Sequence, residues 1–220
     1  MKKLLFWMVL IVGIVALIGS CAKKDEDTAA TAAADNTTST TSYISTTTTA
    51  SGSITMGDDT LSGVYASECL TSASTIAFFK ATGFWASEVN AYGQVFVVTG
   101  SDNISIELYA FTDTSCSNLS QSQKTVSDNV TFGSASGSNY PVTYNNQTQA
   151  LTVHTTAAET ALETLYSNAL DFIVGTPIEL PVSGSGLRYG LWTLSGTTWY
   201  EASSSSATPT SAGTVPHVKQ

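Results

Sequence analysis

Apolar and polar side chains alternate along residues 104–111, the stretch ISIELYAF. Ile104 and Ile106 fall on one side of this stretch, and Ser105 and Glu107 fall on the other. A period of two residues predicts a β-strand with one buried face. The apolar run QVFVV and the turn sequence GSDN come directly before it, so the pattern predicts a β-hairpin.

Similar patterns predict further strands. The stretches YPVTY and ALTVH flank NNQTQ, which predicts a second hairpin, and LRYGLWTL and TTWYEA flank Ser195-Gly196, which predicts a third with a two-residue turn. Residues 61–69 and 125–132 are two more strand candidates. Residues 75–92, TIAFFKATGFWASEVNAY, fit either a strand or a helix.

One helix is predicted late in the chain. Thr156 and Glu159 form the Thr-x-x-Glu pattern of a capping box, in which each side chain bonds the other residue's backbone amide. Apolar residues then recur every three or four positions as far as Ile173, and Gly175 and Pro177 end the pattern. The apolar face of this helix should cover a sheet or close one end of a barrel.

These elements predict a mainly β domain over residues 56–202, an antiparallel β-barrel or sandwich with one packed α-helix. Nearly all the aromatic residues lie in this range, so it can build a core. Residues 22–55 are mostly Thr, Ala and Ser, a composition that predicts a flexible tether, and residues 203–220 are expected to be a disordered tail.

The charge of the chain argues against two kinds of partner. Seventeen acidic residues against eight basic ones give a formal net charge of −9. Phosphate backbones need cationic contacts, so the composition predicts no nucleic-acid partner. Direct binding to anionic lipid head groups is disfavoured for the same reason.

Candidate catalytic chemistry is sparse in the domain. His154 is the only histidine in residues 56–202, and the alternation of its strand places it on an exposed polar face with Thr152. The stretch GSASG resembles a nucleophile elbow, but Ala135 stands where the serine is needed. Cys69, Cys116 and His154 lack the close spacing of zinc ligands. We therefore expect no catalytic residues, no metal and no cofactor, and we expect His154 to be dispensable.

The aromatic residues have two interpretations. Trp85, Tyr109, Trp192 and Trp199 are candidate ligand-binding residues if they line a cavity. The alternative is that they fill the core, which the pattern favours because core aromatics are ordinary.

The first twenty residues have the organisation of a signal peptide. Lys2 and Lys3 precede fifteen uncharged residues, 4–18, a run shorter than the roughly 20 residues of a membrane span. Ile18-Gly19-Ser20-Cys21 follows and resembles the lipobox of bacterial lipoprotein precursors. The resemblance implies a diacylglyceryl group on the Cys21 sulfur, cleavage after Ser20 and acylation of the new amine. An uncleaved signal anchor is the alternative.

The lipoprotein resemblance has two consequences. Ala22, rather than an aspartate, follows Cys21, which favours the outer membrane over the inner membrane as the address. With Cys21 acylated, Cys69 and Cys116 are the remaining pair, and we expect them to form a disulfide in an oxidising compartment.

The stretches SGVYASEC and LYAFTDTSC resemble a loosely defined group of small bacterial lipoproteins with a two-cysteine β domain. SGVY is also similar to the Gly-x-Trp strand of lipocalins, with Tyr65 in place of tryptophan. Our first hypothesis is a membrane-anchored, non-enzymatic module that binds a small apolar ligand or an envelope protein. A surface-interaction protein without a ligand cavity is the alternative, and an envelope hydrolase is the least favoured.

Overall fold

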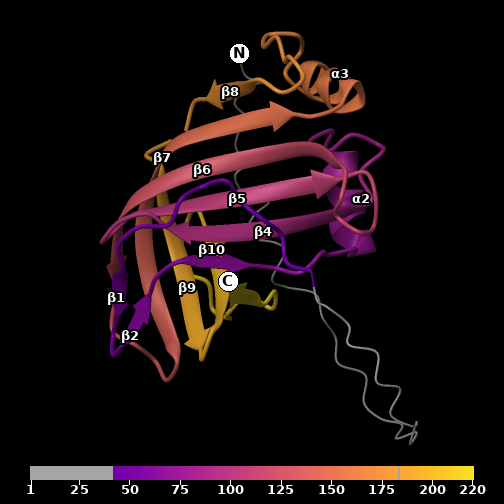
Figure 1. The fold of residues 1–220 in the computed structure, drawn as a ribbon. Helices are drawn as coiled ribbons and strands as arrows, with labels where there is room; N and C mark the ends of the chain where they lie inside the picture. Colours follow the sequence, from indigo (N-terminus) through magenta and orange to yellow (C-terminus); the bar gives the residue numbers. More distant parts are fainter. Residues whose placement is uncertain (1–41, 183) are drawn as a thin grey trace, which may run out of the picture.

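A computed structural model describes residues 42–182 and 184–220 of the chain. The signal-peptide prediction, Cys21 and the first part of the predicted tether lie outside these residues. The described residues form an antiparallel β-barrel, closed where β7 pairs with β6 (Figure 1). In barrel order the eight strands are β6 (Leu119–Phe132), β5 (Ile104–Phe111), β4 (Ala91–Val98), β3 (Val64–Ala66), β11 (His217–Lys219), β10 (Thr198–Ser204), β9 (Leu187–Ser195) and β7 (Asn139–Val153).

Three short strands and two helices complete the described fold. β1 (Ile54–Met56) and β2 (Asp59–Leu61) form a separate hairpin, and β8 (Pro177–Leu180) pairs with the last part of β7. The helices α2 (Ala73–Ala81) and α3 (Thr156–Leu165) lie at the same end of the barrel (Figure 1). We call this the helix end, and the opposite end, with the β4–β5 and β9–β10 turns, the turn end.

The mainly β prediction is confirmed, and the structure is a barrel rather than a sandwich. Two of the predicted hairpins are also confirmed. β4 and β5 pair along their whole length, from Val98 opposite Ile104 to Ala91 opposite Phe111. β9 and β10 pair from Ser195 opposite Thr198, so their two-residue turn is Gly196-Thr197, one position later than predicted.

The predicted hairpin around NNQTQ is wrong. Residues 139–153 form one continuous strand, β7, which pairs with β6 along most of its length. NNQTQ contains no glycine or proline that would favour a tight turn. The register shifts between Val126 and Ser127, which leaves Gln147 without a cross-strand partner, so the irregular sequence produces a bulge instead of a reversal.

The predicted helix exists, but both its ends differ from the prediction. The N-cap is Thr155, whose Oγ1 accepts a hydrogen bond of 3.1 Å from the Ala158 amide, and not Thr156. The helix ends at Leu165 rather than near Ile173, since Ser167 and Asn168 both adopt φ of 55°. The structure also contains a second helix, because the ambiguous segment becomes α2 followed by β4.

Both boundaries of the predicted domain are corrected. Ile44 and Ile54, two large apolar residues of the predicted tether, are 6% and 2% exposed, so residues 43–55 belong to the folded unit. The predicted tail supplies β11, which lies between β10 and β3 and places His217 in the core with 1% exposure. The barrel would not close without this strand.

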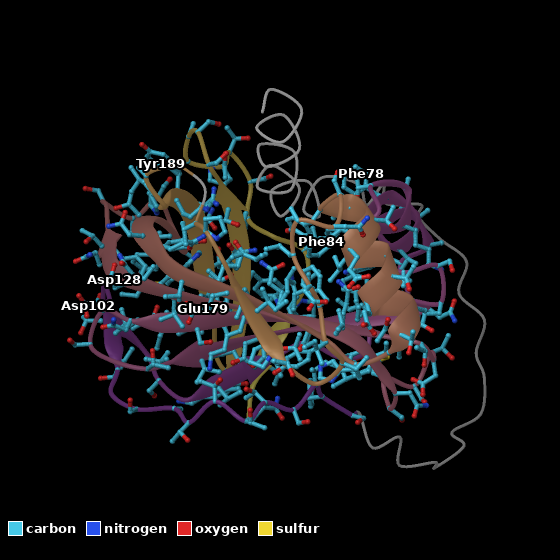
Figure 2. All side chains as sticks on the ribbon, turned by 90° about the horizontal axis from the view of Figure 1, so that it is seen from above. Phe78, Phe84, Asp102, Asp128, Glu179 and Tyr189 are labelled. Carbon is cyan, nitrogen blue, oxygen red and sulfur yellow. A yellow bond between two sulfur atoms is a disulfide. The ribbon has the colours of Figure 1, made fainter. Side chains whose placement is uncertain are left out.

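The core has an apolar cluster towards each end of the barrel. The turn-end cluster includes Phe96, Tyr144, Trp192 and Trp199. The helix-end cluster joins the two helices to the sheet through residues such as Phe79, Trp85, Leu151 and Leu162. Seen from above, Phe78 and Phe84 lie at the helix end, and Asp102 and Asp128 lie at the turn end (Figure 2).

Candidate ligand site inside the barrel

Strands β9 and β10 bring polar side chains into the barrel interior. On β10, Glu201 and Ser203 lie on the same face as Trp199, which is fully buried in the turn-end cluster. On β9, Arg188 and Gly190 precede the inward-facing Trp192 by four and two residues, so they lie on the same face of the strand. Because successive side chains of a strand alternate between faces, Glu201, Ser203 and Arg188 point inward.

Strand β7 adds Tyr144 to this group. Tyr144 pairs directly with Arg188, is 2% exposed, and its ring centroid lies 5.7 Å from that of Trp192. We call Tyr144, Arg188, Glu201 and Ser203, together with the Trp192 indole, the mid-barrel site. Tyr144 and Trp192 also belong to the turn-end cluster, and Arg188, Glu201 and Ser203 extend the site from there towards the helix end.

Glu201 is held in an environment that disfavours its charge. Its accessible surface makes it half-buried, but protein surrounds the carboxyl group, and this desolvation raises its pKa to about 7. The hydroxyl groups of Ser203 and Tyr144 act in the opposite direction and lower the pKa. The protonated form of this carboxyl group is therefore retained to a higher pH than in a solvent-exposed glutamate.

Arg188 is the cation of the site. It is half-buried, and desolvation lowers the pKa of its guanidinium group. Burial raises the pKa of the Tyr144 phenol, and the charge of Glu201 raises it further. The ion pair found among residues 42–182 and 184–220 joins Lys124 to Glu107, so within these residues Arg188 and Glu201 have no salt-bridge partner.

The indole of Trp192 supplies an unused hydrogen-bond donor. Its Nε1 is buried and has no hydrogen-bond partner within the described structure. A Cβ atom at Gly190 would lie 3.0 Å from this nitrogen, so the indole N–H borders the side of Gly190 that faces the interior. Buried donors are rarely left unpaired in native proteins. The Nε1 of Trp199, in the turn-end cluster, also has no partner within the described residues, but the Nε1 of Trp192 lies next to half-buried polar side chains.

Further polar side chains face the interior from the opposite wall of the barrel. Gln94 and Gln123 are half-buried and lie on either side of Leu108 across the β4–β5–β6 sheet. Gln94 Oε1 lies 3.2 Å from Nε2 of His217, whose pKa is lowered to about 4 by burial. The middle of the barrel therefore carries half-buried polar side chains, and an apolar cluster lies towards each end.

The four candidate ligand-binding aromatics do not form one site. Trp192 and Trp199 meet with ring centroids 4.6 Å apart, but Trp85 belongs to the helix-end cluster. Tyr109 lies on the outside of the barrel, where its hydroxyl donates to Glu107. The three tryptophans are at most 2% exposed, which fits the core interpretation.

Most of the mid-barrel site was not predicted from the sequence. The alternation in TWYEASS could have placed Glu201 on the face of Trp199, and the alternation in LRYGLWTL could have placed Arg188 on the face of Trp192. No local signal could have found His217, because it lies outside the predicted domain. His154 is therefore not the only histidine of the folded unit.

His154 is half-buried rather than exposed. It follows the end of β7, and its Nε2 lies 3.1 Å from the Ser122 hydroxyl oxygen. Burial lowers its pKa. It is not part of the mid-barrel site, since it extends the outward face of β7 that carries Thr152, opposite Ser122.

The predicted disulfide is confirmed. The sulfur atoms of Cys69 and Cys116 are 2.09 Å apart, and the bridge joins the segment after β3 to the β5–β6 loop. In the part of the chain that the structure describes, no group of three or more His, Cys, Asp or Glu residues could hold a metal ion. Neither α2 nor α3, nor any other helix within 42–182 and 184–220, is long and apolar enough to cross a membrane.

Comparison with protein-family models and with curated proteins finds no match for this chain.

Proposed function

We propose that the protein is a bacterial outer-membrane lipoprotein, anchored by lipids on Cys21, whose barrel is a non-enzymatic binding module for a small ligand. The charged start, the short apolar run and the lipobox-like sequence before Cys21 support the anchor. A disulfide within the barrel is consistent with an exported protein.

The observation that carries the binding proposal is the unpaired chemistry of the mid-barrel site. Arg188 and Glu201 point inward, have no salt-bridge partner among the described residues and are only half-buried. Trp192 adds a buried N–H without a partner within those residues. A barrel that is only structural gains nothing from such groups, because burying polar groups without partners is unfavourable.

The site favours a particular ligand class. Trp192 and Tyr144 provide apolar surface, and the Arg188 guanidinium and the Trp192 N–H provide donors. We therefore propose a small, largely apolar molecule with one anionic group. Hydrogen bonds to a charged group contribute about 1.5–3 kcal/mol, so Arg188 supplies a substantial part of the affinity.

Native mass spectrometry of the protein purified from its bacterial host tests this proposal. We expect a bound small molecule on the wild type and its loss from Arg188→Leu. Lys124→Leu is the matched control, because Lys124 is an exposed cation on the outer face of β6. Equal ligand occupancy of wild type and Arg188→Leu would contradict the assignment of the site.

Metabolic labelling with a palmitate analogue tests the anchor separately. The wild type should be labelled and Cys21→Ser should not. Equal labelling of the two proteins would show that Cys21 is not the lipidated residue.

A structural or surface-interaction lipoprotein without a ligand is the second candidate. The dense aromatic packing of the turn-end cluster favours it, since Trp192 and Trp199 are fully buried. This candidate predicts that no ligand copurifies with the barrel. An envelope hydrolase stays the least favoured candidate. The carboxylates of Glu107 and Glu201 do not face each other, because Glu107 lies on the outside of the barrel and Glu201 lies inside.

A further inference from the structure

The segment of residues 43–52, which we call the strap, runs along the outside of the barrel from the helix end to the turn end (Figure 1). At the helix end Tyr43 pairs with Glu68, and the Ile44 amide donates to the Ser67 carbonyl at 3.1 Å. Near the turn end the Ser51 amide donates to the Val98 carbonyl at 2.9 Å. The chain then enters the β1–β2 hairpin at the turn end.

A glycine makes the binding slot for the strap. A Cβ atom at Gly93 would lie 2.2 Å from Cγ1 of Ile44, so the Ile44 side chain occupies the space above the bare backbone of β4. The outward-facing Val95 and Val97 on the same strand are fully buried in one cluster with Ile44. This outer face of β4 therefore depends on the strap to exclude water.

A buried carboxylate fixes the middle of the strap. Glu107 points outward from β5 and is only 2% exposed. Its oxygens accept hydrogen bonds from the hydroxyl groups of Thr46 at 2.6 Å and of Thr48. Ser105 and Tyr109 donate to the same carboxylate from β5, and Lys124 Nζ lies 4.0 Å away. Loss of the strap hydroxyls would leave this carboxylate buried with fewer donors, which is unfavourable.

We propose that the strap determines which end of the barrel faces the membrane. This inference rests on the lipid anchor proposed at Cys21. With the strap docked, the chain from the anchor joins the barrel at Tyr43, at the helix end. With the strap released, the chain would join the barrel at Ile54, at the turn end. The strap therefore moves the attachment point from one end of the barrel to the other.

The lengths involved make this choice effective. In sequence, residues 22–42 separate the anchor from the strap. The eight residues of β4 span about 26 Å, so docking or releasing the strap moves the attachment point by about the length of the barrel wall. The end that carries the attachment point is therefore biased towards the bilayer.

The helix end exposes apolar residues that can lie near the bilayer, but its charge does not favour this position. Phe78, Ile173 and Val174 are 39%, 56% and 44% exposed. Glu68 and Asp171 are exposed at the same end, so electrostatic attraction to lipid head groups does not set the orientation. The orientation depends on the strap.

Energy transfer to the bilayer surface tests this inference on the full-length lipidated protein in phosphatidylethanolamine vesicles with acceptor-labelled lipids. A clickable donor is placed either at Ser87, exposed at the helix end, or at Ser101, exposed in the β4–β5 turn. The wild type should show at least about twofold more transfer from position 87 than from position 101, because the ends are about 26 Å apart.

Two variants release the strap in different ways. Gly93→Val fills the slot of Ile44, and Thr46→Val with Thr48→Val removes the donors to Glu107 without adding bulk to the barrel. In both, the ratio of transfer should fall to one or below. Gly133→Val is the matched control, since a Cβ there meets Pro141 only at an ordinary 3.6 Å, and its ratio should equal that of the wild type.

Flotation of the protein with the vesicles reports the lipid anchor, and the transfer ratio reports the strap. Normal flotation with equal transfer from both positions of the wild type would refute the role of the strap alone. An unchanged ratio in both release variants, with native circular dichroism and an intact disulfide, would refute it too. Loss of flotation of the wild type would refute the anchor and the orientation together.

Discussion

Replacing Glu201 with glutamine should change how the stability of the barrel depends on pH. Burial raises the pKa of this carboxyl group from 4.5 to about 7. Each unit of pKa difference between the folded and unfolded states corresponds to about 1.4 kcal/mol, so the raised pKa corresponds to about 3 kcal/mol.

The sign follows from where the proton is bound. Below pH 4.5 the Glu201 carboxyl group is protonated in both states and contributes no pH dependence. As the pH rises from 4.5 to 7, the unfolded chain releases the proton and the folded protein keeps it, so the free energy of unfolding falls. Above pH 7 both states are ionised and the loss is complete. Glu201→Gln stays neutral and lacks this loss.

His217 changes stability in the opposite direction. Its pKa is lowered from 6.5 to about 4 by burial, so the unfolded chain takes up a proton as the pH falls through 6.5 and the folded protein does not. Stability from this source is present above pH 6.5 and is lost towards pH 4. The two effects partly cancel in the wild type. The difference between wild type and Glu201→Gln isolates Glu201, because both proteins contain His217.

Urea unfolding followed by tryptophan fluorescence between pH 4 and pH 8 measures this difference. The free energy of unfolding of Glu201→Gln, minus that of the wild type, should increase by about 3 kcal/mol as the pH rises from 4 to 8. Glu179→Gln is the control, since it makes the same substitution on an exposed residue of β8 (Figure 2). A constant difference between wild type and Glu201→Gln would refute the desolvated environment of the Glu201 carboxyl group.

Three further predictions concern the disulfide, the N-cap of α3 and His154. Replacing both Cys69 and Cys116 with alanine should lower the unfolding free energy by up to about 4 kcal/mol for a loop of 47 residues, and a loss below about 1 kcal/mol in urea unfolding would argue against a stabilising bridge. Thr155→Ala should cost about 1 kcal/mol and Thr156→Ala only a few tenths, and equal losses would contradict the capping role of Thr155. His154→Ala should cost about 1 kcal/mol or less and leave ligand occupancy in native mass spectrometry unchanged, and loss of the ligand would connect His154 to the site.

Local patterns predicted the elements whose partners are close in sequence. The β4–β5 and β9–β10 hairpins could be predicted because alternation and turn residues lie within twenty positions of each other. The β7 error arose from a long strand with a polar middle. One edge of β7 pairs with β6, and the sequence of β7 alone does not show this partner.

Long-range contacts decided the parts that could not be predicted. β11 has three residues in a Ser- and Thr-rich tail, and it becomes a strand only because β10 and β3 leave a gap for it. The strap is likewise held by Gly93 and Glu107, which lie far from it in sequence. Composition predicted flexibility for both segments, because it cannot represent partners elsewhere in the fold.

The indole N–H resonance of Trp192 gives the most direct test of a ligand inside the barrel. Nuclear magnetic resonance spectra are compared for protein purified natively from the bacterial host and for the same protein unfolded, stripped of bound molecules and refolded with its disulfide intact. The binding account predicts that the Trp192 indole signal shifts on stripping, since its Nε1 is unpartnered within the described protein, and that the Trp85 signal in the helix-end cluster does not. Identical Trp192 signals in the two samples would contradict the presence of a ligand at the mid-barrel site.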